Sequence, residues 1–253
     1  MAKGNPNSTL EKAPTGADKK KVKYSYKHPH PAVTTDCVIF CFDGKDLSVL
    51  LIKRGVEPFK GSWAFPGGFL KMDESADECA LRELKEETGL TPEHLEQFHT
   101  FTAVDRDPRE RVVTIAYFAL IKKSNVVGGD DATEAKWFKI DELPTLAFDH
   151  KQIFKEAHTA LKQKIHFEPI GFDLLEEEFS MPSLQRLYEA ILEVKFDRRN
   201  FQKKMLQLGI LEESKSNVKT EGEKKGRSKN KKWRFIPSEY TAMKRNKVFR
   251  LEF

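Results

Sequence analysis

The sequence predicts an α/β (α+β) protein, in which a mixed sheet lies between helices and a small basic domain follows. Three observations support this class. Apolar, β-branched runs alternate with turn formers over residues 33–121, an amphipathic helix interrupts them after residue 75, and two more helical patterns follow residue 180. The 253 residues, 39% hydrophobic and 33% charged, suit one domain of ordinary size and a smaller one.

The runs 33–42 (VTTDCVIFCF) and 47–54 (LSVLLIKR) predict the first two strands, because β-branched and apolar residues dominate both. Asp43 and Gly44 stand between the runs and are typical of a turn, so the two strands are expected to form a hairpin. The same composition predicts further strands at residues 97–103, 112–121 and 135–138.

Three more helices are predicted from caps and periodicity. Asp149 is expected to cap a helix that runs to about Ile165, in which these apolar residues recur at helical spacing: Ile153, Phe154, Ala157 and Leu161. Pro182 opens a helix with one apolar side, formed by Leu184, Leu187, Tyr188, Ile191 and Leu192. Asp197 is expected to cap a basic helix that Gly209 ends.

Breaks in these patterns divide the chain into four segments. A basic, disordered tail is expected over residues 1–24, a first domain over 25–165, a linker over 166–179 and a second domain over 180–253. The boundary lies where Pro169, Gly171 and an acidic run interrupt the helical periodicity.

Composition excludes a membrane protein and a disulfide scaffold. No apolar run approaches the ~20 residues of a membrane span, and no apolar core follows the N-terminal charges, so a cytoplasmic protein is expected. Cys37, Cys41 and Cys79 lack the paired spacing of a zinc site and are odd in number, so we expect buried, reduced thiols.

The positive charge gathers near the C-terminus. The net charge of the chain is +5, and residues 194–250 carry 18 Lys or Arg against 6 Asp or Glu. This distribution points to a nucleic-acid partner for the second domain.

Residues 67–90 (GGFLKMDESADECALRELKEETGL) contain a short helix whose two ends are evident in the sequence. Ser75 and Glu78 form a capping box, and Gly89 is a natural terminating residue. Between them Ala76, Ala80 and Leu84 make a stripe that faces a core.

Glu83, Glu86 and Glu87 lie three and four residues apart, so their carboxylates project from a common side of this helix. Three like charges repel one another unless a cation lies among them, and oxygen-preferring Mg²⁺ or Mn²⁺ is the obvious candidate. The alternative is a solvated acidic surface, because exposed helices are often rich in glutamate.

The full spacing resembles the box of the Nudix hydrolases. That spacing is Gly68, five residues, Glu74, seven residues, Arg82-Glu83-Leu84, one residue, Glu86-Glu87, one residue and Gly89-Leu90. Residues 33 to about 165 are thus similar to a Nudix domain, a mixed sheet between helices that splits nucleoside diphosphates linked to another group.

The resemblance implies roles for the box residues. Glu83, Glu86 and Glu87, with the Gly68 carbonyl, would hold Mg²⁺ or Mn²⁺. Arg82 would orient a glutamate and act with Glu83 and Glu86 in catalysis, and Glu74 would be a supporting acid. The general base stays open between a box glutamate and an acid elsewhere, such as Glu134.

Arginines near the strand ends are candidates for substrate binding, because guanidinium groups clamp phosphates bidentately. They are Arg54, Arg106, Arg109 and Arg111. The stretches DRDPRERVV and LPTLAFDH resemble the Nudix proteins that act on ADP-ribose, which implies a nucleoside diphosphate-sugar as the small-molecule partner.

Residues 180–253 resemble the winged-helix module of Nudix-related transcriptional regulators, which sense ADP-ribose or, in some members, a sugar. The expected DNA-binding residues are Arg198, Arg199, Asn200, Gln202, Lys203 and Lys204 on the basic helix, and Arg227, Lys229, Lys231 and Lys232 in a basic wing.

Two functions of different class follow. The chain is either a metal-dependent hydrolase of ADP-ribose-like compounds coupled to DNA binding, or a regulator whose Nudix domain binds an effector with little or no catalysis. The intact box favours hydrolysis. A homodimer is expected, in which substrate binding shifts the fit to a paired operator. A basic tail that serves only dimerisation or nonspecific contact is the third possibility.

Overall fold

The first two strands form the predicted hairpin. β1 (Ala32–Phe42) pairs with β2 (Leu47–Arg54) in antiparallel register, Phe40 opposite Val49. The computed structural model describes residues 26–129, 131–168, 170–214 and 231–245, and the expected tail over 1–24 lies outside them. The chain divides into two units, residues 1–30 and 31–253, and the second contains all the elements below.

The main sheet is mixed, as predicted. β1 runs parallel to β6 (Val112–Lys122) along its whole length, whereas its other pairings are antiparallel. The order is β3-β2-β1-β6-β5, where β3 is Trp63–Ala64 and β5 is Glu96–Phe101. β7 (Ala132–Lys139) pairs with β2, and β4 (Gly67–Phe69) pairs with β1.

One edge of β1 serves two partners. Residues 34–36 of β1 pair with β4, and residues 40–42 pair with β2. β2 and β4 therefore diverge from a common strand, and the space between them is where the candidate site lies.

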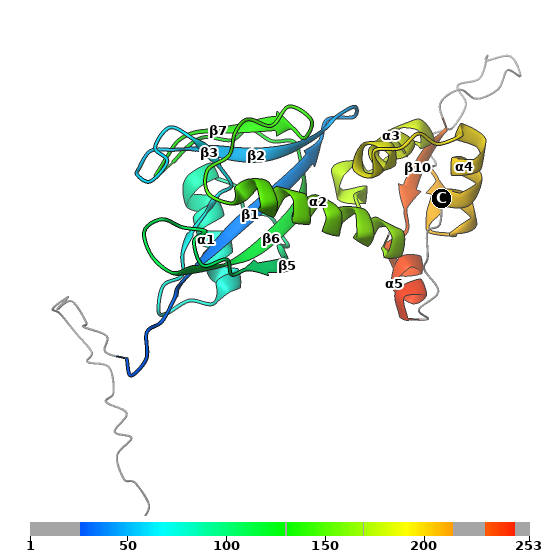
Figure 1. Cartoon of the computed structure of the whole chain (residues 1–253). Helices are drawn as coiled ribbons and strands as arrows, with labels where there is room; N and C mark the ends of the chain where they lie inside the picture. The colour runs from blue at the N-terminus through cyan, green and yellow to red at the C-terminus, as the bar shows by residue number, and fades with distance from the viewer. Residues whose placement is uncertain (1–25, 130, 169, 215–230, 246–253) are drawn as a thin grey trace, which may run out of the picture. The chain divides into compact units, whose positions relative to one another are not determined.

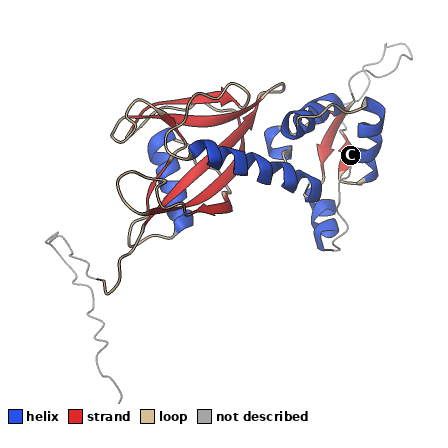
Figure 2. Ribbon diagram, in the orientation of Figure 1, coloured by secondary structure: helices blue, strands red, loops and turns tan. Residues whose placement is uncertain are grey.

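Two helices cover opposite faces of this sheet (Figures 1 and 2). α1 (Ala76–Thr88) packs Ala80 and Leu84 against one face, where it meets Cys37 and Ile39 of β1. α2 (His150–Phe167) covers the other face, where these residues form the core: Val38, Phe40 and Phe42 with Ile153, Ala157 and Leu161. The alternation along β1 follows from the two-residue period of a strand.

Asp149 precedes α2 as predicted, but its side chain makes no capping hydrogen bond. Its carboxylate is instead bound by Arg106. The prediction of a side-chain cap is therefore wrong, because a buried guanidinium competes for the same carboxylate.

All three cysteines are free and buried.

The second domain combines helices with a small sheet. η1 (Phe172–Leu174) and β8 (Phe179–Ser180) precede α3 (Met181–Leu192) and α4 (Arg198–Gln207). β9 (Leu211–Glu213) and β10 (Lys232–Phe235) join β8 in the order β8-β10-β9, and α5 (Pro237–Arg245) follows. Strands paired beside a helical core agree with the winged-helix module expected for this part of the chain.

The α3–α4 core arises from the predicted periodicity. Leu184, Leu187, Tyr188 and Ile191 are fully buried on α3, and Phe201 and Met205 meet them from α4. Leu174, Leu175 and Phe179, within the stretch expected as a linker, are also buried in this cluster.

No helix in the described part of the chain is long and apolar enough to cross a bilayer.

Candidate functional site

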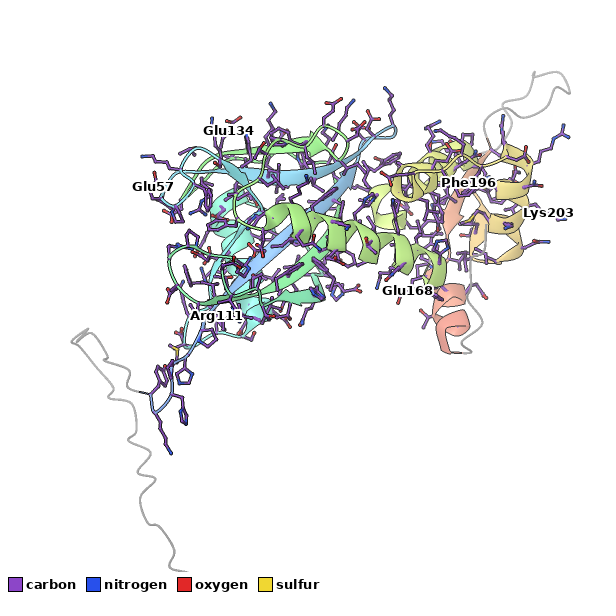
Figure 3. The ribbon with its side chains drawn as sticks, in the orientation of Figure 1. Glu57, Arg111, Glu134, Glu168, Phe196 and Lys203 are labelled. Carbon is purple, nitrogen blue, oxygen red and sulfur yellow. The ribbon has the colours of Figure 1, made fainter. Side chains whose placement is uncertain are left out.

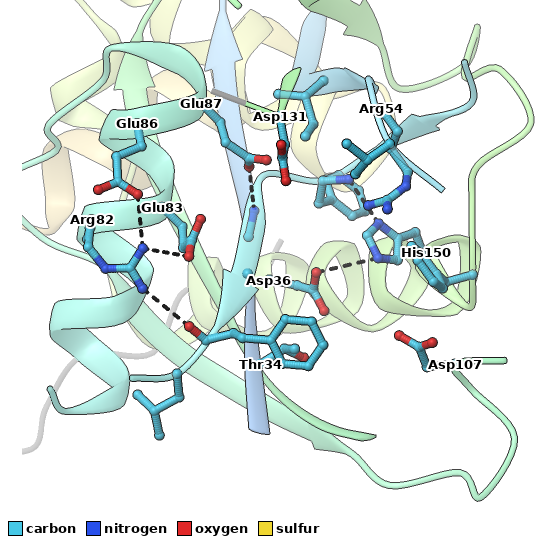
Figure 4. A pocket seen from close by; sticks show the side chains of 18 of the residues that line it. Thr34, Asp36, Arg54, Arg82, Glu83, Glu86, Glu87, Asp107, Asp131 and His150 are labelled. Atoms are coloured by element: carbon cyan, nitrogen blue, oxygen red, sulfur yellow. Dashed lines mark hydrogen bonds and ion pairs between the residues drawn. The ribbon is translucent and has the colours of Figure 1, made fainter. Parts of the chain in front are cut away.

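A pocket of about 450 Å³ opens between β2, β4 and α1 (Figure 4). It brings together residues from distant parts of the sequence. The predicted site residues that line it are Gly68, Arg82, Glu83, Glu86, Glu87, Arg54, Arg106 and Arg109. Residues that sequence reasoning did not single out also line it, among them Asp36, Asp107, Asp131, Phe148 and His150.

Local sequence fixes how α1 presents its acids. The Ser75 side chain accepts from the Glu78 N–H, and Glu78 accepts from the Ser75 N–H at 2.7 Å, so the predicted capping box is present. Gly89 ends the helix in the left-handed conformation, with φ of 76°. With Ala80 and Leu84 buried, Glu83 and Glu87 must face the pocket side.

Arg82 binds three of the box glutamates. Its guanidinium donates to Glu74 at 2.6 and 2.8 Å, to Glu83 at 2.6 Å and to Glu86 at 2.9 Å. Arg82 was expected to orient one glutamate, and in the structure it binds three. Repulsion among the acids is offset here by an arginine from the same helix.

The resemblance to the Nudix hydrolases predicts that Arg82→Ala lowers hydrolysis by roughly 10–100-fold, the usual effect of removing a group that orients metal ligands. Glu74, Glu83 and Glu86 would lose their common partner and adopt several rotamers. Steady-state turnover of ADP-ribose measures the effect, with Lys85→Ala on the same helix as control. Full activity in Arg82→Ala would leave this network without a catalytic role.

Glu87 is a buried carboxyl at the back of the pocket, 5% exposed. Burial raises its pKa to about 8, and the charge of Glu83 adds to this, while a 2.8 Å bond from the Gly67 N–H opposes it. A carboxyl so placed ionises readily only when a positive charge comes close.

Gly68 lies directly against Glu83. A Cβ atom at this position would stand 2.4 Å from the Glu83 carboxylate, so any larger residue would displace that side chain. The oxygens of Glu83, Glu86, Glu87 and the Gly68 carbonyl are the hard ligands that Mg²⁺ and Mn²⁺ prefer, so the donor set fits such an ion. No group of three His, Cys, Asp or Glu in the described residues is already gathered as a metal cage.

The opposite wall of the pocket is basic. Arg54 of β2 donates through Nε to the Pro58 carbonyl at 2.8 Å, and its guanidinium lies over the Phe148 ring. Burial lowers the pKa of Arg54, and the nearby Arg109 lowers it further. Arg109 is held by Asp107, whose two carboxylate oxygens accept at 3.0 and 2.7 Å.

The other two predicted arginines are engaged elsewhere. Arg106 is buried and donates to both oxygens of Asp149 at 3.0 and 2.8 Å. Arg111 donates to the backbone carbonyls of Thr102, Ala103 and Val112 and does not line the pocket (Figure 3). Arg106 therefore supports the pocket floor, and Arg111 braces a loop.

Glu134, the example of an acid outside the box, is exposed on β7 opposite Lys53 and does not line the pocket (Figure 3). Asp131, which directly precedes β7, does. Asp36 and Asp107 also line the pocket, but each binds an arginine, so Asp131 is the candidate base outside the box. The general base is therefore proposed to be one of four acids: Glu83, Glu86, Glu87 or Asp131.

His150 forms part of the pocket floor. Its Nδ1 accepts from the Phe65 N–H at 2.9 Å, and its Nε2 lies 3.4 Å from Asp36. Asp36 also accepts from the Thr114 hydroxyl at 2.7 Å. The amide donor requires an unprotonated Nδ1, which fixes a neutral imidazole with its proton on Nε2. No short-range pattern marks this network.

Stability should fall in mild acid because of His150. Burial lowers the pKa of His150 below its ordinary value, with Arg106 and Arg54 acting in the same direction against Asp36 and Asp149. The unfolded chain then binds the extra proton as pH drops below about 6.5, which favours unfolding. We expect the midpoint temperature of His150→Gln to fall less than that of the wild type between pH 7.5 and 5.5; equal losses would contradict this.

α4 presents the expected DNA-binding residues on its outer side. Asp197 caps the helix by accepting from the Asn200 N–H at 2.9 Å. Phe201 and Met205 are buried, whereas Arg198, Arg199 and Asn200 are exposed and Lys204 is partly exposed. Lys203 is also exposed (Figure 3). Of the wing, Lys231 pairs with Glu213 at 2.7 Å, and Arg227 and Lys229 lie outside the described residues.

Comparison with known families matches both domains. Residues 30–157 match the NUDIX domain, and residues 171–229 match the NrtR DNA-binding winged helix domain.

Individual relatives match over one or both domains. The ADPR responsive transcriptional repressor NtrR of Acinetobacter baylyi is 34% identical over 192 residues, 74% of this chain and 77% of that protein. The ADP-ribose pyrophosphatase of Methanocaldococcus jannaschii is 42% identical over 138 residues, 54% of this chain and 79% of that protein. The crystal structure of Shewanella oneidensis NrtR complexed with a 27mer DNA has a TM-score of 0.66 at 29% identity, covering 87% of this chain and 97% of that one.

Proposed function

Since this chain belongs to the Nudix family and carries an NrtR-type winged-helix domain, we propose that it hydrolyses the diphosphate of ADP-ribose-like compounds and binds DNA. The relatives reported above are of two kinds. One kind is named an ADP-ribose pyrophosphatase and the other an ADP-ribose-responsive repressor.

The observation that carries the proposal is the opposite charge of the two pocket walls. Glu83, Glu86 and Glu87 stand on the α1 side, and Arg54 and Arg109 stand on the other. A diphosphate with a divalent ion has matching polarity, because the ion prefers carboxylates and phosphate oxygens prefer guanidinium groups. A neutral ligand would form an ion pair with neither wall.

Glu83, Glu86, Glu87 and the Gly68 carbonyl would hold Mg²⁺ or Mn²⁺. Such an ion supplies charge neutralisation for the diphosphate and a lower pKa for the attacking water. The residues of the chain do the rest: Arg54 and Arg109 bind the phosphates, Arg82 orients the acids, and a carboxylate takes the proton from the water.

DNA binding rests on the exposed face of α4. Arg198, Arg199 and Lys203 supply cations for phosphates, and Asn200 supplies an amide that can read a base edge. The solved NrtR complex with DNA supports this assignment by its likeness to this chain. We propose a homodimer on a paired operator, with the ligand acting as the signal.

The second candidate function is a regulator that binds ADP-ribose or a sugar with little or no catalysis. Arg82 favours it, because this side chain binds one carboxylate oxygen each of Glu83 and Glu86, two of the three glutamates proposed as metal ligands. The repressor relative supports it as well.

Incubation of the purified protein with ADP-ribose and Mg²⁺ or Mn²⁺ separates the two functions. Metal-dependent release of AMP, abolished by chelator, is expected for the hydrolase. Absence of AMP, with ADP-ribose raising the midpoint of thermal unfolding, would overturn hydrolysis and leave the regulator.

A further inference from the structure

We propose that Phe148 is a positioning residue that holds Arg54 and Arg109 together as one clamp for a multiply charged anion. The pocket would then select a phosphorylated ligand over a neutral sugar. This inference rests on the proposed function and names the residue that gives its site this selectivity.

The Phe148 ring contacts both guanidinium groups. The Arg54 guanidinium carbon lies 4.9 Å from the ring centroid, and that of Arg109 lies 5.8 Å away. Arg109 also lies 5.0 Å from the Phe69 ring. Aromatic faces attract guanidinium groups without neutralising them, so they can hold two cations near each other and leave the charge available to a ligand.

The two arginines differ in their other partners. Arg109 is paired with Asp107, whereas Arg54 forms no ion pair with any carboxylate that the structure describes. Arg54 is half-buried, so Phe148 and the Pro58 carbonyl replace much of the water around its charge. A partly buried cation at a pocket wall, with no ion-pair partner among the described residues, is a site for an anion.

Phe148 itself has an unusual backbone. Its φ is +52°, a conformation that non-glycine residues rarely adopt and that is often kept for function. Phe59 has φ of +63°, and its ring packs edge-on against Phe148 at 4.8 Å. Phe59 therefore restricts the position of the Phe148 ring, which in turn holds Arg54 and Arg109.

The test compares Phe148→Leu and Phe148→Tyr with wild type by titration calorimetry with ADP-ribose, inorganic diphosphate and D-ribose. Leucine removes the aromatic face, so we expect roughly tenfold weaker binding of both anions. Tyrosine keeps the face and should restore most of the affinity. In turnover assays, leucine should raise KM while kcat changes less than twofold. Phe167→Leu, an exposed phenylalanine at the end of α2, is the matched control.

Several results would overturn the inference. They are unchanged anion affinity in a folded Phe148→Leu, equal weakening in Phe148→Tyr, or a wild type that binds D-ribose but neither anion. Thermal unfolding reports whether each variant is folded. Failure of the hydrolase proposal would give a different result. The wild type would not turn over ADP-ribose, whereas anion affinity would still depend on the Phe148 ring.

Discussion

Glu86→Gln is expected to reduce metal-dependent hydrolysis of ADP-ribose by roughly 10²–10³-fold, the range for losing several kcal/mol of charge stabilisation. Glutamine keeps the size of the side chain but removes the negative charge that would hold the ion. The Glu86 side chain is 41% exposed, so its replacement should leave the midpoint of thermal unfolding within about 2 °C of wild type.

Two measurements make this result specific. Glu93→Gln removes an exposed charge that does not line the pocket, and it should keep full activity. Titration of Mn²⁺ should show a weaker metal dependence for Glu86→Gln than for wild type. Near-normal turnover at ordinary metal concentration would contradict the assignment of Glu86 as a ligand.

Arg199→Ala should weaken binding to a selected DNA duplex by roughly tenfold or more, because a base-edge or phosphate contact from a recognition helix is worth about 1–3 kcal/mol. Arg199 is exposed near the start of α4, so its loss should change neither the fold nor turnover of ADP-ribose. The duplex is first selected from a random pool with the wild-type protein, and affinity is then measured over a range of salt.

Lys151→Ala is the matched control, since it removes an exposed cation from α2. A salt dependence that becomes shallower only for Arg199→Ala would show that this cation contacts phosphate. Unchanged affinity would contradict the placement of α4 on DNA. Equal affinity of wild type for unrelated duplexes would instead favour nonspecific contact.

Local patterns in the sequence were sufficient to predict the helices and strands and the glutamates on the α1 side of the pocket. The hairpin of β1 and β2, the capping box of α1 and the Asp197 cap of α4 each depend on residues at most a few positions apart. β7 was predicted too short, at 135–138 instead of Ala132–Lys139, because Thr133 and Glu134 are polar. Pairing with β2 supplies the backbone partners that extend it.

Long-range partners escaped prediction because their choice depends on packing. Arg106 and Arg111 share a loop with Arg109, and nothing in DRDPRER distinguishes the three. The fold brings Asp149, 43 residues away, to Arg106, and it turns Arg111 to backbone carbonyls. Nothing in the sequence marks Phe148 and His150 as pocket residues, because their roles depend on Arg54 of β2 and on Phe65, which follows β3.

The sequence by itself determined the two domain types, the helix that carries Glu83, Glu86 and Glu87, and the basic face of α4, because helical and strand periods relate near neighbours directly. Only the tertiary structure decided which arginines face those glutamates across a pocket. That choice arises where β2 and β4 diverge from β1, since buried guanidinium groups take whichever carboxylate, carbonyl or aromatic ring the packing brings within reach.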